Sequence, residues 1–165
     1  MATPINLSED DIQNLRTELN KMFDQLRTDE SNFTEFYRNP IKFLQNFKIK
    51  ALDYLNGFNS LKDRLNTALK HIIDQSGRIV NSCLICKTTV LIIIFGTLGK
   101  SALLWNGISS GLNAIKDGLK DYFDKTSTEI ERSFNFIDEK LEVITPSHLA
   151  LQICKNLGYC PDYSY

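Results

Sequence analysis

Four cysteines are the residues whose type and spacing most readily suggest chemistry. Cys83 and Cys86 are separated by two residues, the gap used by zinc knuckles and redox dithiols, and Cys154 and Cys160 could complete a four-thiolate site. The second pair has a five-residue gap, and no loop residues surround the first pair. We therefore interpret the cysteines as small apolar side chains packed in a helix, with disulfides or a bound metal as the alternatives.

The two histidines, His71 and His148, do not predict a catalytic site. His71 lies beside an apolar helical stripe, and we interpret it as a residue at the edge of that stripe rather than as a ligand or base. The run from Val90 to Ser101 ends in Gly-Lys-Ser, but a phosphate loop needs glycine five positions before Gly99, where this chain has Ile94. We predict no enzymatic activity, no catalytic residue, no cofactor and no metal site.

Acidic residues are absent from the middle of the chain. Its 165 residues hold 19 Lys and Arg against 20 Asp and Glu, but the 42 residues between Asp74 and Asp117 contain no acid. A net charge of −1 also argues against a nucleic-acid partner. Because a carboxylate in hydrocarbon must be protonated or paired, whereas lysine can extend its ammonium group to the lipid interface, this pattern favours a membrane environment.

The acid-free stretch predicts a hydrophobic helical hairpin over residues 78–116. One arm runs from Ile79 to Gly99, the chain turns near Gly99-Lys100, and the second arm returns through Ser101 to Lys116. The uncharged runs 88–99 and 101–115 are each shorter than the ~20 residues of a usual spanning helix. The predicted membrane-insertion and packing residues are Val90, Leu91, Ile92, Ile93, Ile94, Phe95, Leu98, Leu103, Leu104, Trp105, Gly107 and Gly111, and the predicted interfacial cations are Arg78, Lys87, Lys100 and Lys116.

Amphipathic helices are predicted before the hairpin, in region 1–77. Ser8 and Asp11 resemble a capping box that opens a helix over about residues 9–28. Asp29 or Ser31 can cap a second helix that buries Phe33, Phe36 and Tyr37, and Asn39-Pro40 ends it and starts a third. The apolar stripe then predicts one long helix over 49–76, with Gly57 as its weak point.

A second long helix is predicted after the hairpin. Its apolar stripe runs from Ile108 to Ile144, so region 117–146 continues a helix that begins in the hairpin. This helix would have roughly 37 residues and a length of about 55 Å. Region 147–165 is a short tail. The whole pattern predicts an all-α fold in which long antiparallel amphipathic helices surround a hydrophobic, acid-free central helix or helical hairpin.

One N-terminal motif resembles a known family. Residues Asp29, Phe33, Phe36, Asn39-Pro40, Leu44, Phe47 and Ile49 follow a spacing similar to the helical leader segment of ribosomally made, enzymatically modified peptide precursors. The resemblance covers about a third of the chain. It implies a leader that docks on a modifying enzyme and precedes a short core peptide.

Three functions follow from these observations. The leading hypothesis is a non-enzymatic, membrane-associated helical protein that inserts or forms pores through residues 79–116, with membrane lipid as its partner. The alternative is a cytoplasmic structural subunit of a helical homo-oligomer or larger assembly, in which partner helices cover the apolar segment. A precursor with a leader-like N-terminus is the third. The first residues have neither a basic nor an apolar region, so we predict no cleaved signal peptide.

Overall fold

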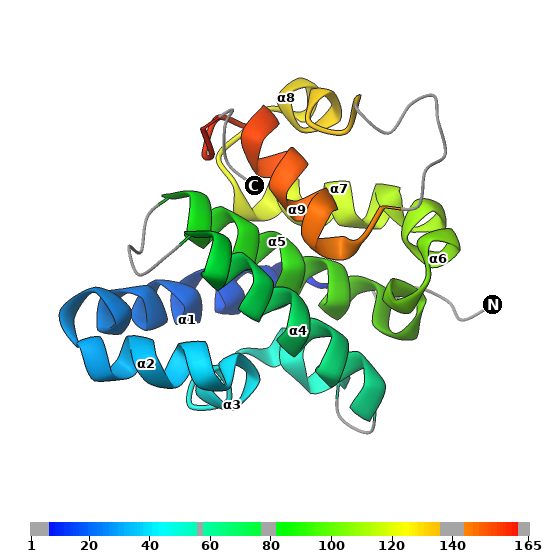
Figure 1. Ribbon diagram of the computed structural model, residues 1–165. Helices are drawn as coiled ribbons and strands as arrows, with labels where there is room; N and C mark the ends of the chain where they lie inside the picture. Colours follow the sequence, from blue (N-terminus) through cyan, green and yellow to red (C-terminus); the bar gives the residue numbers. More distant parts are fainter. Residues whose placement is uncertain (1–6, 56–57, 77–81, 136–143, 162–165) are drawn as a thin grey trace.

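The computed structural model describes residues 7–55, 58–76, 82–135 and 144–161, and within these ranges it contains helices and no strand (Figure 1). The prediction of an all-α fold is confirmed. The α-helices are α1 (Glu9–Thr28), α2 (Glu30–Arg38), α3 (Pro40–Leu44), α4 (Asn59–Ser76), α5 (Ser82–Leu98), α6 (Trp105–Ser110), α7 (Leu112–Tyr122), α8 (Ser127–Arg132) and α9 (Pro146–Asn156), and the 3-10 helices are η1 (Lys50–Leu55) and η2 (Gly99–Leu103).

The first three helices begin and end at the predicted side chains. Ser8 accepts a hydrogen bond from the Asp11 N–H at 3.1 Å, and the Asp11 carboxylate accepts one from the Ser8 N–H at 3.2 Å, which completes the capping box of α1. Asp29 caps α2, and Asn39 caps α3 with Pro40 at its first position. The prediction that Tyr37 is buried is wrong, because 46% of this residue is exposed.

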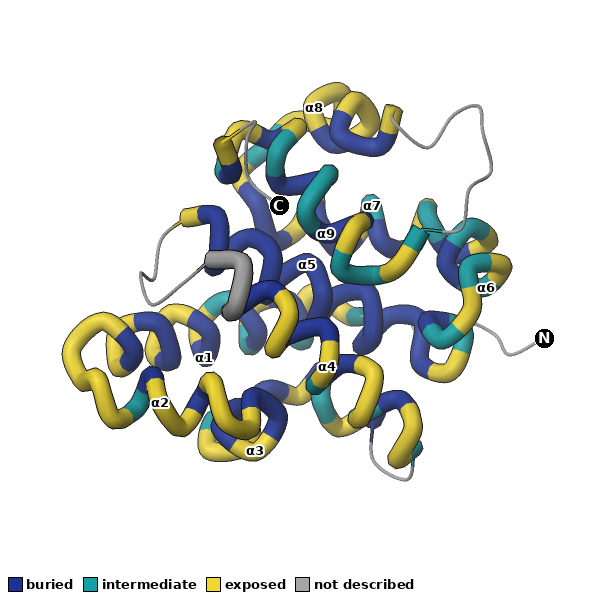
Figure 2. Tube along the Cα trace, viewed as in Figure 1, coloured by how far each residue is buried: buried dark blue, intermediate teal, exposed yellow. Residues whose placement is uncertain are grey.

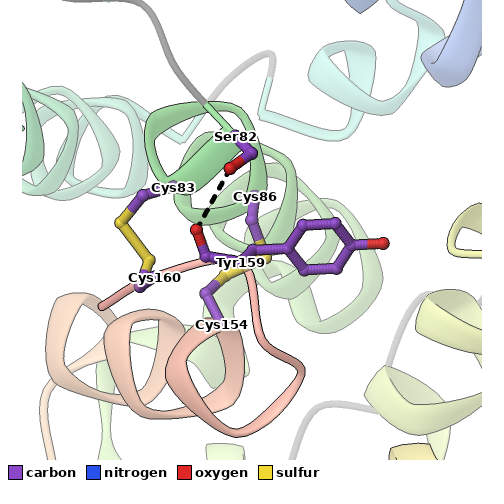
Figure 3. The surroundings of a disulfide bond; sticks show 6 residues. All are labelled: Ser82, Cys83, Cys86, Cys154, Tyr159 and Cys160. Atoms are coloured by element: carbon purple, nitrogen blue, oxygen red, sulfur yellow. Dashed lines mark hydrogen bonds between the residues drawn. A yellow bond between two sulfur atoms is a disulfide. The ribbon is translucent and has the colours of Figure 1, made fainter. Parts of the chain in front are cut away.

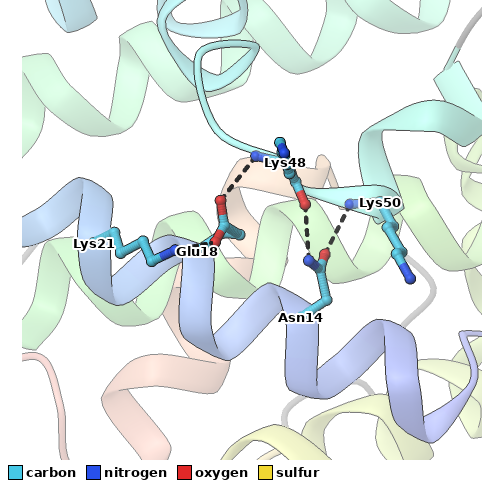
Figure 4. Close-up of polar contacts among 5 residues, drawn as sticks. All are labelled: Asn14, Glu18, Lys21, Lys48 and Lys50. Atoms are coloured by element: carbon cyan, nitrogen blue, oxygen red, sulfur yellow. Dashed lines mark hydrogen bonds and ion pairs between the residues drawn. The ribbon is translucent and has the colours of Figure 1, made fainter.

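The predicted helix over 49–76 is wrong, since the chain forms η1 before α4 begins at Asn59. Two side chains of α1 bind the backbone where η1 begins (Figure 4). The backbone N–H of Lys48 donates to Glu18 at 2.9 Å and that of Lys50 donates to Asn14 at 2.9 Å. These N–H groups therefore bond across the fold instead of to a preceding turn of helix. Hydrogen bonds from Lys21 and from the Lys48 backbone lower the pKa of Glu18. Gly57 lies outside the described residues.

The predicted 55 Å helix is also wrong. Its stripe is divided among α6, α7 and α8, with a break at Gly111 and another between Tyr122 and Ser127. Phe123 is extended, with ψ 139°, and Thr126 caps α8 through a capping box with Glu129. A capping residue sits outside the helix that it caps, so Thr126 cannot lie within a continuous helix. The last part of the predicted helix includes residues 136–143, which lie outside the described ranges.

Helix α5 occupies the centre of the molecule, as predicted for the acid-free segment. It packs against α4, α7, α9, η1 and η2, and it is buried along nearly its whole length (Figure 2). Of its residues only Ser82 and Ile85 are not buried, so the helix has no solvent-facing side. A helix that is apolar all round is stable in water only when other elements surround it, and the amphipathic helices supply that cover. Residues from all four predicted regions share one hydrophobic core.

Candidate functional site

Most of the predicted membrane-insertion residues lie in the protein core. Val90 to Phe95 and Leu98 are at most 1% exposed. Residues Ser82–Leu103 form the one candidate membrane span in the described part of the chain, and their most apolar window has a mean hydropathy of 1.9 and is 89% buried. Length and composition would suit a bilayer, but the core helix of a folded bundle has the same properties.

The second arm of the predicted hairpin reaches the surface. The chain passes from α5 into η2 at Gly99, whose φ of 55° is in the left-handed region that favours glycine. The return as a single helix is wrong, because η2, α6 and α7 follow one another. We call residues 100–106 the 100–106 corner. Leu104 is 70% exposed there, and Leu103 and Trp105 are half-buried.

Two glycines hold α6 close to the end of α5. A Cβ atom on Gly107 would lie 1.9 Å from the carbonyl oxygen of Ser101, and one on Gly111 would lie 2.2 Å from the side chain of Leu98. Glycine is therefore needed at position 107, where the contact is with backbone, whereas a side chain at position 111 would require Leu98 to move. The two residues allow α6 to pack closely against η2 and the end of α5.

The four predicted interfacial cations have different environments. Arg78 lies outside the described residues. Lys100 is exposed and lies 5.0 Å from the centre of the Phe58 ring. Lys116 forms an ion pair with Glu131 at 3.0 Å. Lys87 is only 2% exposed, so it does not lie at the surface of the folded protein.

Lys87 lines a cavity of about 900 Å³ between α4, α5, η2 and the start of α9. Among the described residues, no hydrogen bond or ion pair joins its ammonium group to another side chain, and its burial lowers the pKa of Lys87 below the ordinary 10.5. The cavity lining consists of Ser60, Asp63, Arg64, Thr67, Ala68, His71, Ile72, Lys87, Phe95, Ala102, Leu103, Thr145, Pro146, Ser147, His148 and Leu151.

Sequence reasoning missed this cavity. His71 lies on α4 and His148 on α9, and the two imidazoles line the same cavity although 77 positions separate them. His71 is exposed, which agrees with its interpretation as an edge residue. The signal that sequence analysis could have used is Lys87, because a lone lysine in a buried apolar helix needs a reason to be there.

The cysteines form two disulfides, so their interpretation as free packed thiols is wrong (Figure 3). Cys83 joins Cys160, and Cys86 joins Cys154. Both bonds tie the first turn of α5 to α9 or to the turn that follows it, and the Ser82 hydroxyl donates to the Tyr159 carbonyl beside them at 3.2 Å. The two-residue gap places Cys83 and Cys86 on one side of α5, facing the C-terminal segment.

Each bond closes a long loop. The paired residues are separated by 77 and 68 positions. In the chain-entropy account, loops of this length make each bond worth about 4 kcal/mol. The start of α5 is therefore held against the C-terminal segment by covalent bonds as well as by packing.

No cluster of three or more His, Cys, Asp or Glu suited to a metal ion occurs among residues 7–55, 58–76, 82–135 and 144–161. Comparison with known proteins identified no relative: no protein-family profile, no curated sequence and no solved structure matches this chain significantly.

Proposed function

We propose that this chain is a non-enzymatic helical protein that associates reversibly with anionic membrane surfaces through the 100–106 corner. The observation that carries the proposal is the exposure of Leu104, 70%, which makes it the most exposed large apolar residue of the described surface and places it within the acid-free segment. Trp105 lies next to it and Lys100 is exposed nearby. Apolar side chains with an adjacent tryptophan and lysine are typical of segments that dip into the headgroup region.

The expected binding is weak. Burial of a leucine side chain contributes about 1.5–3 kcal/mol. A lysine near an anionic surface contributes about 1 kcal/mol. Partial burial of Trp105 adds to these, so the corner supports reversible and salt-sensitive attachment rather than permanent anchoring.

The disulfides favour attachment at the surface over complete insertion. Ser82–Leu103 could span a bilayer only after leaving the core, and two covalent bonds hold its first turn to the C-terminal segment. Disulfides persist in oxidising compartments, which argues against the cytoplasmic alternative. An assembly subunit would also need an apolar surface for its partners. The described surface has no such apolar patch, because Tyr37 and Leu104 are its exposed large hydrophobic residues.

Vesicle flotation of the oxidised full chain tests the proposal. We expect the protein to float with vesicles of phosphatidylcholine and phosphatidylglycerol at about 0.05 M salt, and to float less at about 0.5 M, where exposed charges are screened. Pure phosphatidylcholine should retain little protein.

Leu104→Asp should reduce flotation at least about tenfold, because it removes about 2 kcal/mol of burial and adds a like charge to the anionic surface. Its matched control is Tyr37→Asp, which places the same charge at the other exposed large apolar residue and should float like the wild type. A wild-type protein that stays soluble at low salt, or a Leu104→Asp variant that floats normally, would overturn the proposal.

A further inference from the structure

The cavity at Lys87 combines apolar walls with a buried cation that has no partner among the described residues. Lys87 and Phe95 both line it from α5, and Ala102 and Leu103 of the 100–106 corner extend the wall. Ala68 and Ile72 of α4 and Leu151 of α9 supply further apolar surface. A buried ammonium group is stabilised by an opposite charge or by hydrogen bonds, and the described residues give Lys87 neither.

The charged groups around the cavity favour an anion. Arg64, His71 and His148 carry N–H donors at its exposed rim, and among the described residues Asp63 is the one acid that lines it. The first turn of α9 also contributes, and the N-terminal end of a helix carries a partial positive charge. A cationic ligand would meet Lys87 and Arg64, whereas a small inorganic anion would leave the apolar walls unused.

We propose that this cavity binds an apolar monocarboxylate, such as a medium-chain fatty acid, with its carboxylate at Lys87 and its alkyl chain along Phe95 toward Leu103. Lys87 and Phe95 are two helical turns apart on the same broad stripe of α5, so the polar and apolar ends of such a ligand would lie along the helix. A volume of about 900 Å³ lies within the ~300–1,000 Å³ of known small-ligand sites.

The burial of Lys87 supports this assignment. Its ammonium group has lost solvating water, and a ligand carboxylate beside it would replace that lost stabilisation. The cavity lies beside the 100–106 corner, but ligand binding in the cavity does not require that the protein binds membranes. Each can fail without the other.

Titration calorimetry on the oxidised full chain, in the absence of lipid, tests the inference with decanoate and decanol as probes. We expect saturable one-site binding of decanoate, with an affinity at least about tenfold above that of decanol, as a charged hydrogen bond would give. Lys87→Met should remove this preference by weakening decanoate and leaving decanol unchanged. Lys87→Arg, which keeps the positive charge, should retain the preference.

Lys70→Met is the matched control, because Lys70 is an exposed residue of α4 outside the cavity lining and its loss changes the net charge equally. This variant should bind decanoate like the wild type. Thermal unfolding of each variant establishes that it is folded. Absence of saturable decanoate binding to the wild type, equal affinities for the two probes, or a preference that survives in folded Lys87→Met would overturn the inference.

Discussion

At position 87 the chain places a lysine in its buried central helix, where it lines the cavity. The residue is 2% exposed, and desolvation is the cause that lowers its pKa. Methionine has a similar length and no charge, so it would fill the same space without the desolvation cost. The lysine therefore lowers the stability of the ligand-free protein, which is a common property of residues that bind or react.

Lys87→Met should raise the free energy of unfolding at pH 7 by about 1 kcal/mol or more. The gain should shrink as pH rises toward 10.5, the ordinary pKa of the lysine. Between the lowered native pKa and 10.5 the unfolded chain binds more protons than the native protein, so wild-type stability rises with pH across this window.

Urea unfolding of the wild type and Lys87→Met at several pH values measures the difference between their free energies of unfolding. The other titrating groups are the same in both proteins, so their contributions cancel. Lys70→Met should match the wild type throughout. A wild type that is more stable than Lys87→Met at pH 7, or a difference that does not change with pH, would contradict this description of Lys87.

Among the elements, α8 shows how one side chain interrupts an apolar stripe. The Thr126 hydroxyl accepts a hydrogen bond from the Glu129 N–H at 3.1 Å, and the Glu129 carboxylate accepts one from the Thr126 N–H at 3.1 Å. These bonds satisfy N–H groups that would otherwise lack partners at the start of a helix. They also lower the pKa of Glu129.

Thr126→Ala should lower the free energy of unfolding by about 1 kcal/mol, the usual cost of losing such a cap. Thr128→Ala changes an exposed threonine within the same helix and should cost nothing, because alanine favours the helix. Chemical denaturation of the two variants gives the comparison. Equal stabilities would indicate that residues 108–132 follow the continuous helix that the stripe predicts.

Sequence reasoning located the elements whose caps are local. Ser8, Asp29 and Asn39 each bond to a backbone N–H two or three residues away, so their role is visible in the sequence. The segment that leads into η1 is held by Asn14 and Glu18, thirty or more positions from the backbone groups that they bind, and periodicity contains no record of such contacts.

The candidate sites also differ in how far the sequence predicts them. The acid-free segment showed which residues avoid water, and the structure places α5 in the core and Leu104 at the surface. The cavity could not be predicted, because His71, Lys87 and His148 come together only when three elements pack. Spacing along the chain likewise left the partners of the cysteines open.

For the molecule as a whole, the disulfides are the main covalent restraint. Replacing Cys86 and Cys154 together with serine should lower the free energy of unfolding by about 2–4 kcal/mol, because the unfolded chain regains the freedom of a long loop. Thermal or urea unfolding measures this loss. A double variant as stable as the wild type would show that the bond adds nothing to packing.

Peptide mapping without reduction tests the pairing itself. Trypsin leaves Cys83 and Cys86 on one peptide and places Cys154 and Cys160 on two others, because Lys155 lies between them. Three peptides should therefore remain joined until reductant is added. A Cys83–Cys86 bond would release the first peptide alone and contradict the connection between α5 and the C-terminal segment.

Trp105 is the only tryptophan of the chain and lies in the 100–106 corner, so its fluorescence tests the membrane proposal most directly. With anionic vesicles and oxidised protein, we expect its emission to shift to shorter wavelength, and lipids brominated near the headgroup to quench it more than lipids brominated near the chain ends. Emission that is unchanged at millimolar lipid, or stronger quenching by the deep bromines, would contradict attachment of the folded protein through this corner.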